Sequence, residues 1–509
     1  DTKLEWRANI SYTKRDSYSQ ALTGADTRVL TDNMETGTVE GVLKAGSYLY
    51  QIYTKGEEWN VNAKLNFKRD FELFGLENGL LAGGEYTFDD NMGEGKIYDP
   101  FNPPYGNLGY RPLSFDEVPA LHTASLYLED EIKGYWRFHP YSINLGFRYE
   151  MYNPHTLHLD GVFNEKGVVE SKNGTYMNPR IRLRYEPLDD TQIRFSWGKS
   201  SKMPSMTNIY NGPVYFDVVE ENISPPDSVP LISTYVYDWD NTLLKGYQNE
   251  KTELSVDRKF GSVGLTLTGF YSYSSDIPRG VLSPVTLYRY RWETWPDGEP
   301  TPIDTIFTEA TSGEASYQNV GWHKSYGLEF MLTTKRIERL STSFRISAAY
   351  YETGSGGEGI YPGSPRINTA LDRTIYPYYR YIEDFRRKMV VNYNADWFIK
   401  RLGLWVTFFL QQTLFDGDQD VIDPYPYAAA YYDPIEGRVI SVTPEQSTDL
   451  GLDRVFDDDD LELFEKPNDR FLFNVNISKS VGRGSELSLF VHNVLDDPCL
   501  LYTSPSPRD

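Results

Sequence analysis

Hydrophobic and polar residues alternate along much of the chain, and the pattern is clearest in residues 470–497. There Phe471, Phe473 and Val475 recur at every second position, with mostly polar residues between them. Because successive side chains of a β-strand point to opposite faces, this spacing predicts a strand with one apolar face. A short turn at residues 481–484 and a second alternating run follow, so the segment is predicted to form a β-hairpin.

The same alternation returns along the rest of the chain. Further clear examples are residues 4–12, 59–68, 141–149, 181–185 and 193–197. A helix repeats its apolar positions every three or four residues, and that spacing is almost absent here. We therefore expect an all-β chain of about seventeen strands, each near the ~9–11 residues that cross a bilayer at a tilt.

The predicted connections between strands alternate between short and long. Short turns are expected near residues 134–140, 187–190, 261–262, 336–339, 400–402 and 482–485, and long polar segments at 89–121, 203–250, 276–325, 352–386 and 416–469. Long loops without secondary structure are uncommon in compact soluble domains. Outer-membrane barrels, in contrast, have short turns on one side and long loops on the other. The pattern thus predicts a transmembrane antiparallel β-barrel.

Aromatic residues mark the ends of the apolar faces. They are Tyr149, Trp197, Tyr273, Tyr350 and Trp397. Tyr and Trp favour the membrane–water interface, so we interpret these residues as membrane-interface aromatics. The alternative is that they pack the core of a soluble protein. The opposite faces carry Arg, Asn, Glu and Ser, which a dry core could hold only with hydrogen-bond partners, whereas a water-filled or plugged lumen accepts them.

Composition narrows the possible functions. The 509 residues carry a formal net charge of −23 and contain no basic block, which argues against binding of nucleic acid. No run of apolar residues approaches the ~18 of a membrane-spanning helix. The single cysteine, Cys499, excludes an internal disulfide. Residues 499–509 resemble a translated sequencing adapter, so we expect a barrel domain over residues 1–498 and a non-native tail after it.

Two groups of residues are candidates for ligand binding. Arg180, Arg182, Arg184 and Arg194 fall on the predicted inward face of one hairpin. They would either solvate a lumen or form a positive strip for an anionic ligand. Tyr378, Tyr379 and Tyr381 belong to a tyrosine-rich loop. They would either stack on sugars or aromatic ligands or anchor the loop by packing.

The sequence offers little support for a metal, a cofactor or an enzymatic reaction. His155 and His158 form an isolated pair in a predicted external loop. Residues 416–420 have the aspartate spacing that begins a calcium loop, but the glycine at the sixth position and the glutamate at the twelfth are absent. Divalent cations at the surface remain an alternative. No Gly-rich phosphate loop follows a strand and opens a helix. We expect no catalytic residues, no metal site and no cofactor.

Several segments, in this order and at this spacing, resemble the barrel of TonB-dependent outer-membrane receptors, in particular those of the Bacteroidetes type. The closing segment LSLFVHNVLDD at 487–497 looks like the family's penultimate strand. SLYLEDEIK at 125–133 with INLGFRY at 143–149, and NPRIRLRY at 178–185 with IRFSWGKSSKMP at 193–204, resemble two family hairpins. YGLEFMLT at 326–333 resembles a further strand.

The resemblance implies a receptor in the outer membrane of a Gram-negative cell. It would import a large, scarce nutrient such as a siderophore, cobalamin, a glycan or a peptide. Its implied partners are outer-membrane lipid, the TonB–ExbB–ExbD complex and a surface lipoprotein. The alternatives are a passive outer-membrane channel, a surface adhesin, or a soluble all-β glycan-binding protein.

The sequence departs from the family pattern at both ends. The plug domain and the short box that binds the energising partner are not found in it. Family barrels have roughly 22 strands. We therefore expect a barrel that is incomplete at both ends, with the energising partner contacted through a missing N-terminal region.

Overall fold

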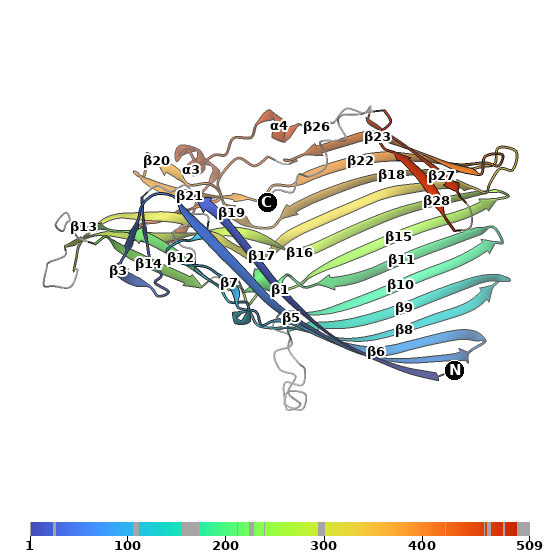
Figure 1. The fold of residues 1–509 in the computed structure, drawn as a ribbon, viewed down its shortest axis with the longest axis horizontal. Helices are drawn as coiled ribbons and strands as arrows, with labels where there is room; N and C mark the ends of the chain where they lie inside the picture. Colours follow the sequence, from blue (N-terminus) through green and yellow to red (C-terminus); the bar gives the residue numbers. More distant parts are fainter. Residues whose placement is uncertain are drawn as a thin grey trace.

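A computed structural model describes residues 2–23, 27–104, 111–153, 173–210, 212–222, 229–238, 240–293, 301–422, 424–462, 464–465, 470–481 and 484–495. Its largest element is a curved sheet in which fifteen long strands follow one another through fourteen consecutive antiparallel pairings (Figure 1). These strands are β1 (Thr2–Thr23), β5 (Tyr48–Leu73), β6 (Leu76–Asn91), β8 (Leu121–Trp136), β9 (His139–Tyr152), β10 (Thr175–Leu188), β11 (Thr191–Lys202), β15 (Tyr247–Phe260), β16 (Val263–Glu293), β17 (Thr301–Thr334), β18 (Thr342–Gly357), β22 (Asp384–Ile399), β23 (Leu404–Gln419), β27 (Arg470–Ser480) and β28 (Glu486–Val491).

The register separates an apolar face from a polar face, as the alternation predicts. In the β5–β6 pair, Lys64 lies opposite Glu85, and the next residue, Leu65, points to the other face. Leu65, Leu128 and Leu254, from three different strands, are each 51% exposed. An exposed apolar band around the outside of the strands is the surface that lipid requires.

Among the described residues, the tight turns between the long strands lie at one end of the sheet, on the right in Figure 1, and the long connections lie at the other. We call these the turn end and the loop end. β5 and β6, for example, are joined by Phe74 and Gly75, whose φ angles are 53° and 77°. Positive φ at both central residues matches the twist of a two-residue hairpin. The predicted asymmetry of the connections is therefore present.

The number of strands in the large sheet is close to the predicted seventeen. The whole sheet has 18 strands, because the short strands β7 (Gly95–Ile97), β13 (Glu221–Asn222) and β26 (Phe464–Glu465) add to the long ones. Nearly all pairings are antiparallel, and the two-residue pairing of β13 with β16 is parallel. Among the described residues, no pairing joins β1 to β28.

The long connections contain folded structure of their own. β2 (Arg28–Leu30) pairs with β4 (Val42–Lys44). β3 (Gly37–Glu40), β12 (Pro213–Val219) and β14 (Leu231–Asp238) form a three-stranded sheet, here called the loop sheet. A second group, here called the cap, consists of β19 (Ile360–Pro362), β20 (Arg366–Asn368), β21 (Arg373–Arg380), β24 (Ala430–Asp433), β25 (Arg438–Ser441) and the helix α3 (Pro444–Asp449). The described residues also include the helices α2 (Met206–Ile209) and α4 (Asp458–Leu461) and the 3-10 turn η2 (Phe115–Glu117).

One expected loop is mostly strand. Residues 276–325 were expected as a long polar connection, but β16 and β17 continue through much of this segment as a paired hairpin, up to Glu293 opposite Thr301. Register shifts near Ile277 and Pro284 interrupt the ladder. These irregularities disturb the two-residue period, which explains why the pattern there does not predict a strand.

Within the ranges described above, we find no helix long and apolar enough to cross a membrane.

Candidate functional site

The four arginines of the predicted strip do share one face. β10 and β11 pair so that Arg184 lies opposite Arg194, with Arg182 and Arg180 at the next positions on that face. The continuous register across β8, β9 and β10 puts Glu129 on the same polar side. The arginine strip is thus part of the inner wall. It extends from Arg184 and Arg194 near the turn end to Arg180 near the middle of β10.

Carboxylates neutralise most of this strip. Arg194 binds Asp257 through two hydrogen bonds of 2.9 and 3.2 Å. Arg184 lies 2.5 Å from Glu186, and Arg180 lies 3.4 Å from Glu129. Among the described residues, Arg182 has no ion-pair partner. Three of the four cations therefore have a carboxylate of their own, so the wall here is not a continuous positive surface.

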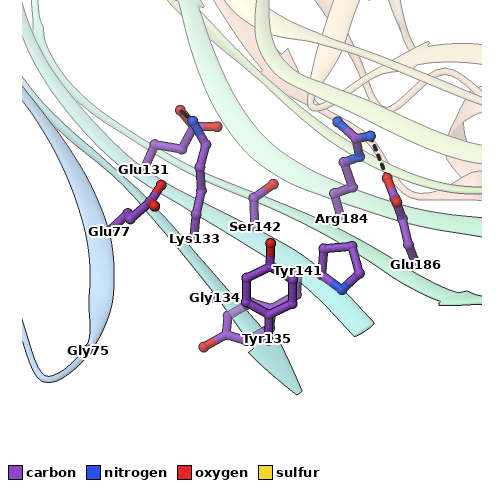
Figure 2. Close-up of a pocket in the computed structure, with 11 residues that line it drawn as sticks. Gly75, Glu77, Glu131, Lys133, Gly134, Tyr135, Tyr141, Ser142, Arg184 and Glu186 are labelled. Atoms are coloured by element: carbon purple, nitrogen blue, oxygen red, sulfur yellow. Dashed lines mark hydrogen bonds and ion pairs between the residues drawn. The ribbon is translucent and has the colours of Figure 1, made fainter. Parts of the chain in front are cut away.

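A cavity of about 410 Å³ opens beside Arg184 at the turn end (Figure 2). Figure 2 shows Arg184 bonded to Glu186, with Lys133 and Glu131 across the cavity, and these last two lie 3.0 Å apart. Glu77 adds a third carboxylate to the lining. With three carboxylates and two cations, the cavity has no excess of positive charge and does not suit an anion.

A polar ladder crosses the inner wall from β5 to β10. Glu85 lies 3.6 Å from Lys64 and 3.3 Å from Arg148. Arg148 also donates to Glu150 at 2.7 Å. Asn178, 2% exposed, donates to the second oxygen of Glu150 at 2.7 Å. Charges that alternate in sign along this ladder satisfy one another, which allows a polar inner face without a dedicated ligand.

A second cationic group lies on the inner face at the loop end, and sequence reasoning missed it. We call it the Asp416 cluster: Arg386 and Lys388 of β22, Asp416 of β23 and Arg470 of β27. The Asp416 carboxylate lies 3.2 Å from Arg386, 3.2 Å from Lys388 and 3.0 Å from Arg470. Three cations thus share one carboxylate. The sequence signal was the pair of cations Arg386 and Lys388 at alternate positions, but Arg470 lies far away in the chain.

The first aspartate of the calcium-like segment 416–420 belongs to this cluster. Asp416 is 3% exposed and its carboxylate is bound by arginine and lysine side chains. The described residues contain no group of three or more His, Cys, Asp or Glu side chains that would hold a metal ion. His155 and His158 lie outside the described residues, as does the predicted tail 499–509.

The loop sheet is held by a buried ion pair. Arg111 donates to both oxygens of Asp217 at 3.1 Å, and the two side chains are 3% and 0% exposed. Thr234 donates to the same carboxylate at 2.8 Å. Burial raises the pKa of the Asp217 carboxyl despite the nearby guanidinium. A charge held this deep positions the loop that carries Arg111 against β12.

The cap has its own hydrophobic core. Ile375, Tyr379, Ala428, Tyr431 and Leu452 are its buried members. Tyr379 is 4% exposed, and its hydroxyl donates to the Leu452 carbonyl at 2.6 Å. Of the two roles weighed for the tyrosine-rich loop, this geometry fits the packed anchor for Tyr379.

The other two predicted tyrosines are less deeply buried. Tyr378 is half-buried, and burial raises its pKa to about 12. The Tyr381 ring lies 4.9 Å from the Tyr361 ring, and the Arg279 guanidinium lies 5.7 Å from its centroid. These two side chains are better placed than Tyr379 to meet a ligand, although both also pack within the loops.

The β16–β17 hairpin stands between the loop sheet and the cap and bonds to both. Tyr237 of the loop sheet donates to the Thr286 carbonyl at 3.3 Å. The Thr286 hydroxyl lies 2.8 Å from the Tyr432 hydroxyl of the cap. The loop sheet, the hairpin and the cap thus form one contiguous assembly at the loop end.

The predicted interface aromatics divide between the two ends of the sheet. Tyr149, Trp197, Tyr273 and Tyr350 lie toward the loop end, and Trp397 lies at the turn end, opposite Thr342. Tyr149 lies ten positions along β9 from His139, which pairs with Trp136 at the turn end. These ten positions span about 33 Å along the strand. At a tilt of ~40° from the membrane normal, they span ~25 Å along that normal, which is the height of a lipid-facing band.

Comparison with known proteins gives the family and the fold. The family model described as TonB dependent receptor-like, beta-barrel matches residues 1–490. The siderophore receptor PirA from Acinetobacter baumannii superposes with a TM-score of 0.51 at 15% identity, covering 97% of this chain and 56% of that chain. The ferric enterobactin receptor PfeA, a protein of Pseudomonas aeruginosa, gives 0.50 at 14% identity, covering 97% of this chain and 55% of that chain.

At identities this low, the superpositions show the fold alone. Together with the family model, they confirm the predicted all-β barrel architecture. The chain spans just over half the length of these two structures. Comparison with curated proteins by sequence finds no significant match.

Proposed function

We propose that the protein takes part in nutrient import across the outer membrane, because the chain belongs to the family of TonB-dependent receptor β-barrels. The match over residues 1–490 is the observation that carries this proposal. The family consists of transport receptors and not of enzymes, in agreement with the expectation that the chain catalyses no reaction.

In this proposal the chain supplies the wall of the barrel and its external loops. The exposed apolar band would face the lipid of a Gram-negative outer membrane, and the polar inner face would line the lumen. Short turns would lie on the periplasmic side and long connections outside the cell, as in other outer-membrane barrels. The loop sheet, the hairpin and the cap would then be the first parts to meet a solute.

The transported solute in this proposal is a large, scarce nutrient: a siderophore, cobalamin, a glycan or a peptide. A siderophore is supported by the fold that the chain shares with the siderophore receptor PirA and the ferric enterobactin receptor PfeA. Energy would come from the TonB–ExbB–ExbD complex. The Bacteroidetes-type motifs quoted above support a relative of that type, for which a surface lipoprotein is a further proposed partner.

The proposal is tested with the complete gene in its own host. Uptake of labelled candidate nutrients is compared among the wild type, a strain lacking the gene, and a strain lacking TonB activity. We expect uptake that is lost in both mutants, together with a heat-modifiable band in the outer-membrane fraction. Uptake that needs the gene but persists without TonB would indicate a passive channel. Normal uptake without the gene would contradict import and favour an adhesin.

A further inference from the structure

Three successive turns at the turn end, on the right in Figure 1, are rich in lysine and arginine. They join β15 to β16 at residues 258–262, β17 to β18 at 334–342, and β22 to β23 at 399–404, and are called here the basic turns. We propose that the basic turns bind the phosphate groups of anionic phospholipids at the surface of the membrane. This inference goes beyond nutrient import and rests on the proposed function only for placing the sheet in a membrane.

The basic turns have a positive charge of their own. They carry two, three and two lysines or arginines, and Glu338 is their single carboxylate. All seven cationic side chains are exposed. None of them makes an ion pair with another of the described residues. The charge of these turns is therefore available to a partner outside the protein.

Carboxylates of adjoining residues reduce this charge without cancelling it. Asp257 is bound by Arg194 of the arginine strip at 2.9 Å. Three further aspartates at the neighbouring strand ends have no ion-pair partner among the described residues: Asp189, Asp190 and Asp396. With these three and Glu338 counted, seven cations stand against four carboxylates. The region as a whole therefore favours an anion.

The basic turns lie at the depth of lipid headgroups. Trp397, 40% exposed, is the interface aromatic at this end of the sheet, and Lys400 follows it by three positions. Three residues of a strand at a tilt of ~40° rise ~8 Å along the membrane normal. The headgroup layer extends roughly 5–7 Å beyond the hydrocarbon on each side. A ring at the edge of the hydrocarbon thus places Lys400 beside the phosphates.

Arg258 shows that part of the charge points to the lipid side. In the β15–β16 pair it lies opposite Leu265, on the same face of β15 as Leu254 and Val256, which are 51% and 37% exposed. Its guanidinium lies 4.7 Å from the centroid of the Phe260 ring, and Phe260 is 50% exposed. A long cationic side chain at such a place keeps its stem in the apolar layer and its charge at the headgroups.

Apolar side chains within the same turns favour a lipid surface as the partner. Leu340 and Leu402 are each 56% exposed, and Ile337 is 38% exposed. The turns therefore present apolar and cationic side chains together, next to the exposed apolar band of the strands. An anionic membrane surface buries the apolar groups and pairs the cations at the same time.

Three other turns at this end differ from the basic turns. The turn at 187–190 carries two aspartates and no cation, and the turn at 74–75 carries no charge. In the turn at 134–140, Arg137 is the single cation, and its guanidinium lies 5.5 Å from the centroid of the Trp136 ring. Bound anionic lipid should therefore concentrate between β15 and β23 and not surround the whole sheet.

The test is native mass spectrometry of the complete encoded protein, purified in detergent and titrated with dioleoylphosphatidylglycerol or dioleoylphosphatidylcholine. We expect wild type to retain the anionic lipid in preference to the zwitterionic one. Each cation near an anionic surface contributes about fivefold to binding, so Arg258→Gln should weaken binding of the anionic lipid about fivefold and Lys400→Gln/Arg401→Gln tenfold or more. Arg258→Lys keeps the charge and should retain most of the binding.

Arg137→Gln is the matched control. Like Arg258, Arg137 is an exposed guanidinium beside an aromatic ring at the turn end, but it lies outside the basic turns. Its replacement should change lipid binding less than twofold. Glycerol 1-phosphate, added at the same phosphate concentration, should not displace the lipid, because it has no chains to lie against the apolar band.

The outcomes decide between a lipid site and the alternatives. Equal retention of the two lipids by wild type would overturn the proposal and favour an acidic protein as the partner of these turns. An equal loss in Arg137→Gln would show general attraction of anions and no site, and displacement by glycerol 1-phosphate would show a site for free phosphate. If the lipid preference follows the predicted order but uptake does not need the gene, the lipid site stands and the import function fails.

Discussion

The arginine strip and the Asp416 cluster are both sets of cations on the inner wall, yet they differ in how carboxylates are shared. In the strip, Arg180, Arg184 and Arg194 each have a carboxylate of their own. In the cluster, three cations share Asp416. A run of arginines in the sequence therefore does not by itself make a positive surface, because the partners on neighbouring strands decide the local charge.

Exposure separates the two regions further. The Arg194 and Asp257 side chains are 47% and 29% exposed, so solvent screens their attraction. The Asp416 side chain is 4% exposed. Water cannot replace the partners of a carboxylate this deep. We therefore expect substitutions in the cluster to affect stability far more than equivalent substitutions in the strip.

The largest effect is expected for Asp416→Ala. Removing the shared carboxylate leaves Arg470 buried without a counter-charge, which costs about 3–5 kcal/mol in comparable buried pairs. The loss should appear as a lower urea midpoint for the transition between the folded and unfolded bands in gel electrophoresis. A change under about 1 kcal/mol would show that the two regions do not differ as we propose.

The pair Arg111–Asp217 is a third case for comparison. It has one cation for one carboxylate, as in the arginine strip, but both side chains are buried, at 3% and 0% exposure. Arg111→Met leaves the Asp217 carboxylate with the hydroxyl of Thr234, and we expect a local loss of about 3 kcal/mol. Hydrogen exchange of the β12 and β14 amides measures it. The double variant Arg111→Met/Asp217→Leu removes both charges and should recover part of the loss, whereas no recovery would contradict an electrostatic cause.

A smaller, pH-dependent effect is expected at the same pair. Because burial raises the pKa of Asp217, the folded loop sheet retains a proton at pH values where the unfolded chain has lost it. The stability of the loop sheet should thus fall as the pH rises from the pKa of the Asp217 carboxyl in the unfolded chain through its raised pKa in the folded protein. Hydrogen exchange of β12 between pH 4 and 7, corrected for intrinsic rates, tests this. Asp217→Asn should abolish the dependence, and a pH-independent wild type would refute it.

The smallest effect is expected in the arginine strip. Arg194→Gln removes an exposed ion pair, and a double-mutant cycle with Asp257→Asn should give a coupling of about 0.2–1 kcal/mol. The same urea midpoint provides the measurement. Coupling as large as the loss in Asp416→Ala would erase the contrast between the two regions.

The sequence allowed the repeating part of the fold to be predicted. The alternation at residues 59–68 and 141–149 depends only on the two-residue period of a strand, and the structure has β5 and β9 there. The common face of Arg180, Arg182 and Arg184 follows from the same rule. Each of these inferences concerns residues close together in the chain.

The features that the sequence did not predict depend mostly on contacts between segments that are distant in the chain. Nothing near Arg194 in the sequence shows that Asp257 will be its partner, and nothing near Arg386 points to Arg470. The hydrophobic core of the cap joins Tyr379 to Leu452, which belong to different connections. Residues 276–325 were interpreted as a loop because bulges shift the period within β16.

The core of the cap also limits how the external assembly can deform. Separating Tyr379 from its core neighbours would cost several kcal/mol, in the range of about 3–5 for a buried aromatic residue. In contrast, Thr286 of the β16–β17 hairpin bonds to Tyr432 and to the Pro434 carbonyl, contacts worth about 1 kcal/mol each. We therefore expect a displacement of the external assembly to break these hydrogen bonds before it opens the core of the cap.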